Sequence, residues 1–475
     1  MKAVVIGGGL AGLTAAIELA EQGAHVTLLE AKPRLGGATC SFSRDGLTVD
    51  TGQHVFLRCC TAYQDLLGRL GMTAHAPVQP RFDVTVLSPG VKKGRLRRTA
   101  LPGPLHMMPA LTRYPFISLK ERTLVSRAAL PMRRVDPADP AVDSVRFGDW
   151  LAARGQSENA RRALWDLFTV SALNIAGDDA SLSLAATVVK TGLLGANAAA
   201  DVGVPAVPLA DLHGEAAARL LSSQGADIRL NTKVAAITVT APPPTPLASA
   251  EPNLPFRIEL ERERGAEGTE LWADAVVLAV PPEQAARLIP ADALPAATVS
   301  GWSGLGASPI VNIHVIYDRK VLDLPFAAAV NSPVQWIFDR TAISGLAGGG
   351  QRVQYLALSQ SAGDVWVDMP VAELREIFLP ALAELLPAAR GANVAEFFVT
   401  RERRATFRQV PGTGALRPAA ATKLPGLVLA GAWTDTGWPD TMEGAVRSGL
   451  AAAAELRRNI LATETVNADS LGVRP

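Results

Sequence analysis

A glycine-rich turn close to the start of the chain constrains the fold more than any other feature. An apolar run over residues 3–6 leads into Gly7-Gly8-Gly9-Leu10-Ala11-Gly12, and a second apolar run ends at Glu30 after an alanine-rich helical pattern. The tight turn needs Gly7, the approach of a pyrophosphate to bare backbone needs Gly9, and close packing of helix on strand needs Gly12. The helix N-terminus favours phosphate, and Glu30 can accept both hydroxyls of an adenosine ribose. The pattern predicts a Rossmann-type α/β domain that binds a dinucleotide with an unphosphorylated ribose.

The residues that follow Glu30 narrow the dinucleotide to FAD. Arg34-Leu35-Gly36-Gly37 comes soon after it, and this extension resembles the flavoprotein amine oxidase and carotenoid desaturase superfamily. The resemblance implies non-covalent FAD, with the arginine and the paired glycines along its pyrophosphate and ribityl chain. It also implies an amine oxidase-like architecture, in which a Rossmann-type FAD-binding domain is interleaved with an α+β substrate domain.

The length of the chain, 475 residues, exceeds one ordinary domain. We expect a discontinuous FAD-binding domain over residues 1–78, 205–290 and 396–460, and a substrate-binding domain over 79–204 and 291–395. Residues 241–255 are rich in proline and predict a flexible loop, and residues 461–475 predict a polar, frayed tail. In the second FAD-binding segment, the resemblance places the backbone of Val234 against the adenine ring.

A second motif near the C-terminus supports the same cofactor. Residues 427–434 form an apolar strand pattern that contains Gly431, and a turn with Asp435 leads to Met442-Glu443-Gly444 at the start of a helix. That helix N-terminus would aim amide groups at the pyrimidine edge of the flavin and stabilise an anionic reduced ring. Members of the superfamily often carry an acidic or hydroxyl residue where this chain has Ala432. Asp435 is the candidate to take over the contact with the ribityl chain.

Several further segments give a narrower resemblance, to the bacterial hydroxysqualene dehydroxylases. They are Asp50-Thr51-Gly52-Gln53-His54, residues 101–106, Ala172-Leu173-Asn174-Ile175 with residues 180–182, and Gly437-Trp438-Pro439 with residues 441–444. The resemblance spans most of the chain. It implies FAD-dependent reductive removal of the hydroxyl of hydroxysqualene, an allylic alcohol, giving squalene and water in bacterial triterpene or hopanoid biosynthesis. Reduced flavin would deliver hydride from N5 to the allylic carbon, after an electron donor that the sequence does not identify has reduced it.

Gly52, Gln53 and His54 are expected beside the flavin, because the resemblance makes residues 50–54 the flavin-facing segment. Hydroxide is a poor leaving group, so the reaction also needs an acid or a strong hydrogen-bond donor. His54 is the first candidate for this catalytic role, since imidazole titrates near neutral pH. The alternative is that His54 only packs against the ring or hydrogen-bonds to it.

A substrate of thirty carbons implies a long apolar tunnel in the substrate domain. Asn174 and Trp438 are candidate substrate contacts, although an asparagine at this kind of position more often completes a turn. The apolar residues 105–111, with Arg95, Arg97, Arg98 and Arg113 nearby, could dip into a membrane interface to collect lipid. A basic, solvated loop over a helix hairpin is the alternative.

Three other functions share these motifs. A carotenoid desaturase or isomerase would use the same fold and an apolar substrate, but residues 52–54 argue against it. An amine oxidase would frame the flavin with aromatic residues, and an aromatic content of 5% with four tyrosines gives that limited support. A prenyl-binding carrier without flavin would make little use of two intact FAD motifs.

Composition excludes some classes and suggests a compartment. A net charge of +1 gives no reason to expect nucleic acid, and the spacing of Cys40, Cys59 and Cys60 does not indicate a metal site. Because the first strand begins at the N-terminus, we expect no signal peptide. We therefore expect a reduced, cytoplasmic setting, with the option of peripheral contact on the inner face of the membrane.

Overall fold

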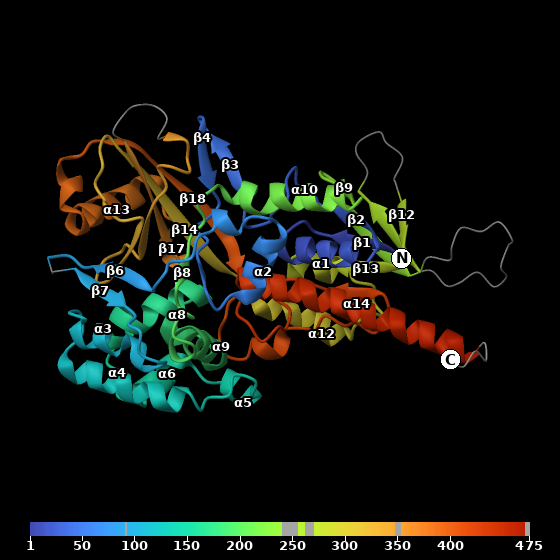
Figure 1. The fold of residues 1–475 in the computed structure, drawn as a ribbon, viewed down its shortest axis with the longest axis horizontal. Helices are drawn as coiled ribbons and strands as arrows, with labels where there is room; N and C mark the ends of the chain where they lie inside the picture. Colours follow the sequence, from blue (N-terminus) through green and yellow to red (C-terminus); the bar gives the residue numbers. More distant parts are fainter. Residues whose placement is uncertain (91–92, 240–254, 262–269, 347–352, 471–475) are drawn as a thin grey trace.

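Two β-sheets of different character organise the molecule (Figure 1). The structure is a computed structural model that describes residues 1–90, 93–239, 255–261, 270–346 and 353–470. A five-stranded parallel sheet has the order β19-β13-β1-β2-β9, and a seven-stranded, mainly antiparallel sheet has the order β18-β14-β17-β16-β15-β6-β7. The fold confirms the predicted α/β class with a second, α+β part.

The parallel sheet gathers short strands from distant parts of the chain. They are β1 (Lys2–Ile6), β2 (His25–Leu29), β9 (Asp227–Arg229), β13 (Ala275–Leu278) and β19 (Leu427–Leu429). Both faces are covered, which explains why β1 and β13 read as continuous apolar runs. Helices α1 (Leu10–Glu21), α10 (Ala216–Ser223) and α14 (Met442–Ser470) pack on one face, and a three-stranded sheet of β10 (Val234–Val239), β11 (Phe256–Leu260) and β12 (Glu270–Ala273) packs on the other.

Helix α14 lies along α1 because both helices present small residues at their contact. A Cβ atom built on Gly449 would lie 2.4 Å from the Ala11 carbonyl oxygen, so only glycine allows this approach. The helix continues through Ser470, so residues 461–470 extend α14, and the expected fraying of this tail stays a prediction. Residues 471–475 lie outside the described residues, as does the expected proline-rich loop apart from Pro255.

The seven-stranded sheet carries α13 (Val371–Leu385) on one face. Its strands are β6 (Asp83–Leu87), β7 (Gly94–Arg97), β14 (Ser308–Tyr317), β15 (Phe326–Ala329), β16 (Trp336–Asp339), β17 (Gln354–Gln360) and β18 (Val394–Thr406). Strand β18 pairs with β14 along its length, and so it crosses the expected domain boundary between residues 395 and 396. Cross-strand pairing overrides that boundary, because the strand stays in this sheet through Thr406.

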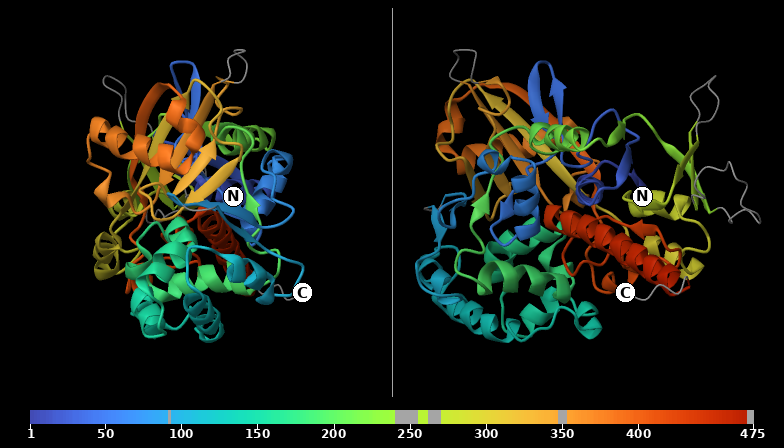
Figure 2. Two further views of the ribbon diagram at one scale, coloured as in Figure 1. Left: turned by 90° about the vertical axis from the view of Figure 1, so that its left-hand side faces the viewer. Right: turned by 45° about the vertical axis from the view of Figure 1, so that its right-hand side comes forward.

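A layer of helices lies beneath the seven-stranded sheet, on the side away from α13 (Figures 1 and 2). Its main members are α3 (Met108–Arg113), α4 (Leu119–Met132), α5 (Pro140–Asp143), α6 (Phe147–Ala152), α8 (Asp166–Leu173) and α9 (Leu182–Val188). Apolar side chains of this layer and of the sheet belong to one buried cluster. Between the two sheets lie the hairpin of β3 (Ser41–Arg44) and β4 (Leu47–Asp50), and helix α2 (Thr61–Arg69). Among the helices described, none has both the length and the apolar character needed to cross a bilayer.

Candidate active site

The turn between β1 and α1 needs its glycines for two different reasons. Gly7 has φ +107°, and a Cβ on Gly7 would lie 2.3 Å from the Ala279 carbonyl oxygen. A Cβ on Gly12 would lie 1.9 Å from the Gly7 carbonyl oxygen, so the protein's own packing demands both glycines. A Cβ on Gly9 would meet no atom closer than 3.8 Å. The protein's own packing therefore does not demand Gly9, and its place at the N-cap of α1 suits a pyrophosphate bound against bare backbone.

Glu30 follows β2 directly, and its buried carboxylate is held beside the glycine turn. Its two oxygens accept hydrogen bonds from the Gly8 amide at 2.7 Å and the Lys32 amide at 2.8 Å. A carboxylate has about four lone-pair positions. The two amide bonds fix the side chain and leave acceptor capacity for ribose hydroxyls.

Residues 34–37 form a second wall of the same crevice. The Gly36 amide donates to the Gly8 carbonyl at 2.8 Å, and a Cβ on Gly37 would lie 2.9 Å from Gly9 Cα. Gly36 and Gly37 have φ of +98° and +59°. The Arg34 guanidinium contacts the Cys40 sulfur and, at 3.3 Å, the Gly37 carbonyl. The loop therefore closes over the turn through backbone, and its expected course along the FAD pyrophosphate stays a prediction.

Val234 lies next to this crevice at the start of β10. The Thr232 amide donates to the Glu30 carbonyl at 2.8 Å, and the Asn231 amide donates to the Lys32 carbonyl at 3.1 Å. Val234 itself is buried. A segment some 200 residues from Glu30 is thus brought to the ribose end of the proposed cofactor site.

The C-terminal motif departs from its expected geometry at two points. Strand β19 ends at Leu429, not at residue 434, because Gly431 takes φ +142° and turns the chain. Asp435 is exposed, and its carboxylate accepts a hydrogen bond from the Gly437 amide at 3.1 Å. The side chain closes its own turn, so the structure gives no support to Asp435 as a replacement for the acid missing at Ala432.

Met442 begins α14 as expected, but the Glu443 side chain is committed to the protein. The fully buried carboxylate accepts hydrogen bonds from the Ala62 amide at 3.2 Å and the Tyr63 amide at 2.8 Å, and it pairs with Arg447 at 2.7 Å. These amides belong to the first turn of α2, where they lack helical partners. The Glu443 carboxylate is therefore held by protein partners, and the expected contact of this helix N-terminus with FAD, through its backbone amides, stays a prediction.

Asp50 anchors the segment that was expected to face the flavin. Its buried carboxylate accepts hydrogen bonds from Ser41 Oγ at 2.6 Å and the Leu209 amide at 3.0 Å, and it forms an ion pair with Arg340. His54 follows four residues later and is partly buried. Desolvation lowers the pKa of His54, and the nearby Asp50 charge opposes that shift. The imidazole is therefore neutral at pH 7.

Sequence reasoning missed Asn312, which meets residues 50–54 from the other sheet. Asn312 is fully buried on β14, and its Nδ2 donates to the Thr51 carbonyl at 3.2 Å. The side-chain oxygens of Asn312 and Gln53 are buried without a hydrogen-bond partner. No motif marks Asn312, because only the packing of β14 against a segment some 260 residues away brings it to this place.

Asn174, a candidate substrate contact, instead hydrogen-bonds to three distant residues of the protein. It ends α8 with φ +51°, and its Nδ2 donates to the Ser308 carbonyl at 2.9 Å and to Thr406 Oγ1 at 3.1 Å. Its Oδ1 accepts from the Ala362 amide at 2.7 Å. Both amide hydrogens are used by the protein, so this prediction is corrected. Trp438 stacks on Arg447, with 4.6 Å from the guanidinium carbon to the ring centroid, and its substrate contact stays a prediction.

Arg417 and Asp440 were also missed. One Arg417 nitrogen donates to the carbonyls of Ala432, Thr434 and Trp438 at 2.6–3.1 Å, and so holds the loop before α14. Desolvation raises the pKa of Asp440 to about 6, although the Phe407 amide and Arg417 act against the rise. A carboxyl group of this kind, two residues before Met442, is a second possible acid.

We call the place where residues 50–54 meet Asn312 of the seven-stranded sheet the junction. An apolar layer adjoins it. Phe326 and Phe338 of the sheet have ring centroids 6.1 Å apart, and Phe82 reaches Phe168 of α8 at 6.2 Å. Trp336 ties the sheet to the helices through a 2.8 Å hydrogen bond from Nε1 to Ser171 Oγ. The layer has the composition that a long apolar substrate needs, while the tunnel itself stays a prediction.

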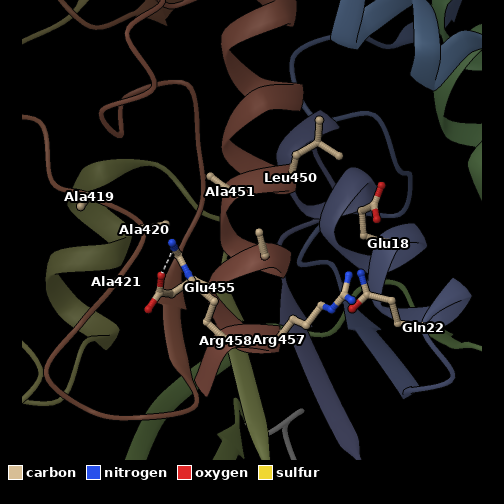
Figure 3. Close-up of a pocket in the computed structure, with 11 residues that line it drawn as sticks. Glu18, Gln22, Ala419, Ala420, Ala421, Leu450, Ala451, Glu455, Arg457 and Arg458 are labelled. Atoms are coloured by element: carbon tan, nitrogen blue, oxygen red, sulfur yellow. Dashed lines mark hydrogen bonds and ion pairs between the residues drawn. The ribbon is translucent and has the colours of Figure 1, made fainter. Parts of the chain in front are cut away.

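A groove of about 720 Å³ lies elsewhere, between α1, α14 and residues 419–421 (Figure 3). Its walls include Leu450, Ala451 and Arg458, which lie two to four turns beyond Met442 on α14. The groove is therefore remote from the flavin-facing turn, and we assign it no role. Within the described residues, no group of three or more histidine, cysteine or acidic side chains could hold a metal ion.

The fold is that of a two-part flavoenzyme. One part holds the parallel sheet and the glycine turn at residues 7–12, and the other holds the seven-stranded sheet. The family model for flavin containing amine oxidoreductases matches residues 10–457. The chain belongs to this family. It is an FAD-dependent oxidoreductase, which confirms the predicted class and cofactor.

Named relatives refine the similarity. The chain is 29% identical over 453 residues to a hydroxysqualene dehydroxylase of Rhodopseudomonas palustris, covering 94% of this chain and 96% of the relative. It is 27% identical to that of Sinorhizobium fredii, with the same coverage. A zeta-carotene desaturase of Zea mays is 25% identical, covering 96% of this chain and 83% of the relative.

Solved structures support the fold. Putrescine oxidase bound to putrescine superposes with a TM-score of 0.68 at 18% identity, covering 96% of this chain and 99% of that chain. Cyclohexylamine oxidase from Brevibacterium oxydans gives a TM-score of 0.68 at 19% identity, with the same coverage.

Proposed function

We propose that this chain catalyses the reductive dehydroxylation of hydroxysqualene to squalene. The observation that carries the proposal is the end-to-end similarity to two hydroxysqualene dehydroxylases, each aligned over 94% of this chain. In the reaction the allylic C–O bond breaks, a hydride replaces the hydroxyl group, and a proton joins the departing oxygen to give water. FAD, once reduced by an external two-electron donor, supplies the hydride.

The residues that would hold FAD lie in the nucleotide half of the junction. Gly9 and the first turn of α1 would bind the pyrophosphate, and Glu30 would bind the ribose. Backbone around Val234 would meet the adenine ring, and residues 52–54 with the first turn of α14 would face the flavin. We also propose the division into an FAD-binding and a substrate-binding domain, with β18 assigned to the second.

The chain's own residues must supply the proton and exclude water. Because burial lowers the pKa of His54, this imidazole donates a hydrogen bond at pH 7 and carries a transferable proton only at more acidic pH. If His54 is the acid, the single-turnover rate rises as the pH falls below about 6.5, and His54→Ala removes the rise. If Asp440→Asn removes this pH dependence and His54→Ala does not, the proton comes from the Asp440 carboxyl group.

The test is an anaerobic single turnover. The yellow holoenzyme is reduced with dithionite, excess reductant is removed, and hydroxysqualene is added while flavin absorbance and extracted lipid are followed. Reoxidation with stoichiometric squalene supports the proposal. Flavin that stays reduced, with unchanged substrate, contradicts it. Oxidative turnover of a carotenoid precursor would favour the second candidate function, which the similarity to the desaturase of Zea mays suggests.

We also propose that helix α4 touches an anionic membrane surface, where an apolar substrate would be collected. Leu119 and Leu130 are 75% and 65% exposed. They lie eleven residues apart, and this spacing differs by about 20° from three full helical turns, so the two side chains lie on the same side of the helix. Exposed Lys120 and Arg127 adjoin them. Replacing both leucines by glutamate should lower sedimentation with phosphatidylglycerol vesicles about tenfold and leave FAD content unchanged. Equal sedimentation would contradict the contact.

A further inference from the structure

Asn312 is a buried polar side chain on the mainly apolar strand β14, and unlike buried His314 on the same face it keeps an atom without a partner. Val311, Ile313 and Val315 of β14 pack into the cluster beneath α13. Side chains alternate along a strand, so Asn312 points to the opposite face, toward the nucleotide half. Its hydrogen bond from Nδ2 to the Thr51 carbonyl fixes the amide, and leaves Oδ1 directed away from that carbonyl. This Oδ1 is buried and has no partner.

A second buried acceptor lies across the junction. Gln53 Oε1 also lacks a partner. A Cβ built on Gly52 would lie 3.2 Å from His54 Nε2 and 3.9 Å from Asn312 Nδ2. Gly52 therefore marks the point where the His54 and Asn312 side chains converge from the two halves of the molecule, and Gln53 is the next residue in the chain. Leaving a buried acceptor unpaired costs folding free energy, so an unpaired acceptor at the segment expected to face the flavin points to a ligand that donates.

We propose that Asn312 and Gln53 accept the hydroxyl hydrogen of the substrate alcohol and thereby select it over hydroxyl-free squalene. This inference rests on the proposed function and deepens it. An O–H group donating to neutral amide oxygens keeps its lone pairs free for the proton that makes water the leaving group. When the hydroxyl has gone, the acceptors lose their partner, which favours release of squalene.

The experiment compares the alcohol and the hydrocarbon on the same holoenzyme. Binding of hydroxysqualene and of squalene to the oxidised enzyme is measured from the perturbed flavin absorbance, so that no turnover is needed. The variant is Asn312→Leu, which keeps the size and removes the acceptor. Gln53→Met is the second variant, in case Asn312→Leu does not fold.

Gln360→Leu is the matched control. Gln360 is also fully buried with an unpartnered amide, but it pairs with Val311 and so shares the α13 face of the same sheet. We expect wild type to prefer the alcohol. Asn312→Leu should reduce that preference about tenfold to a hundredfold, with FAD content and squalene affinity retained. Gln360→Leu should leave the preference unchanged.

Three outcomes would overturn the inference. They are a wild type without preference for the alcohol, an Asn312→Leu variant that keeps the preference, and a variant that loses FAD or shifts the flavin potential while the preference stays. The last would assign the amide to the cofactor. A wild type that prefers the alcohol but fails the single turnover would contradict the proposed function and leave the recognition by Asn312 standing.

Discussion

The nucleotide side of the junction is built from backbone, whereas the side formed by the seven-stranded sheet is built from side chains. Around Gly9 the surface is bare backbone, and Gly7, Gly12 and Gly37 let three segments approach one another. Across the junction, Asn312 offers an acceptor that the protein itself leaves unpaired. A backbone site tolerates almost no added atom, while a side-chain site can be altered without loss of the fold.

The largest expected effect separates two glycines of the same turn. Gly12→Ala should destabilise the protein by more than about 4 kcal/mol or prevent folding, because its Cβ would lie 1.9 Å from backbone. Gly9→Ala should leave the stability of the apoprotein within about 1 kcal/mol, yet weaken FAD binding about a hundredfold. Urea unfolding and FAD titration measure the two. Wild-type FAD affinity in Gly9→Ala would refute the backbone account.

Glu443→Ala should lower the free energy of unfolding by about 3 kcal/mol, because it leaves two buried amides of α2 and the guanidinium of Arg447 without a partner. The control is Glu158→Ala, which removes a solvent-exposed pair with Arg162 and should cost less than about 1 kcal/mol. Urea midpoints give both values. Unchanged stability with weakened FAD binding would instead show that the carboxylate contacts the cofactor.

Acid should destabilise both halves through buried histidines. Desolvation lowers the pKa of His213 and of His314 to about 3. Between about pH 6.5 and 3 each histidine binds a proton in the unfolded chain but not in the folded protein, so the free energy of unfolding falls as the pH falls. Each of the two histidines should lower the free energy of unfolding by about 2 kcal/mol between pH 7 and pH 5. His213→Gln tests the nucleotide side and His314→Gln the sheet side, and a variant with the wild-type pH slope would contradict burial of that imidazole.

The smallest effect concerns the acid missing from the C-terminal motif. Ala432→Asp should strengthen FAD binding several-fold, worth about 1 kcal/mol. Asp435→Ala should change FAD affinity less than twofold, because the exposed carboxylate only closes its own turn. FAD titration measures both. A large loss in Asp435→Ala would show that this side chain does reach the cofactor.

The sequence by itself determined the nucleotide crevice, the fold class and FAD. The reason is that the turn from Gly7 to Gly12, the acid at Glu30 and the loop at Gly36 are set by local sterics within a few dozen residues. Even there, no local pattern indicates what holds the side chain of Glu443, because its partners on α2 lie about 380 residues away. Motif matching marks such a position without saying where the side chain points.

Tertiary structure alone decided the other half of the site. Asn312 reaches Thr51, Asn174 joins two strands and the turn at Ala362, and Arg417 contacts three carbonyls, all through contacts that no local pattern encodes. A strand records in its sequence which residues alternate, but the neighbour that each face meets depends on how distant strands pair and how the two sheets pack. That packing placed an unpaired amide oxygen where a hydroxyl group can use it.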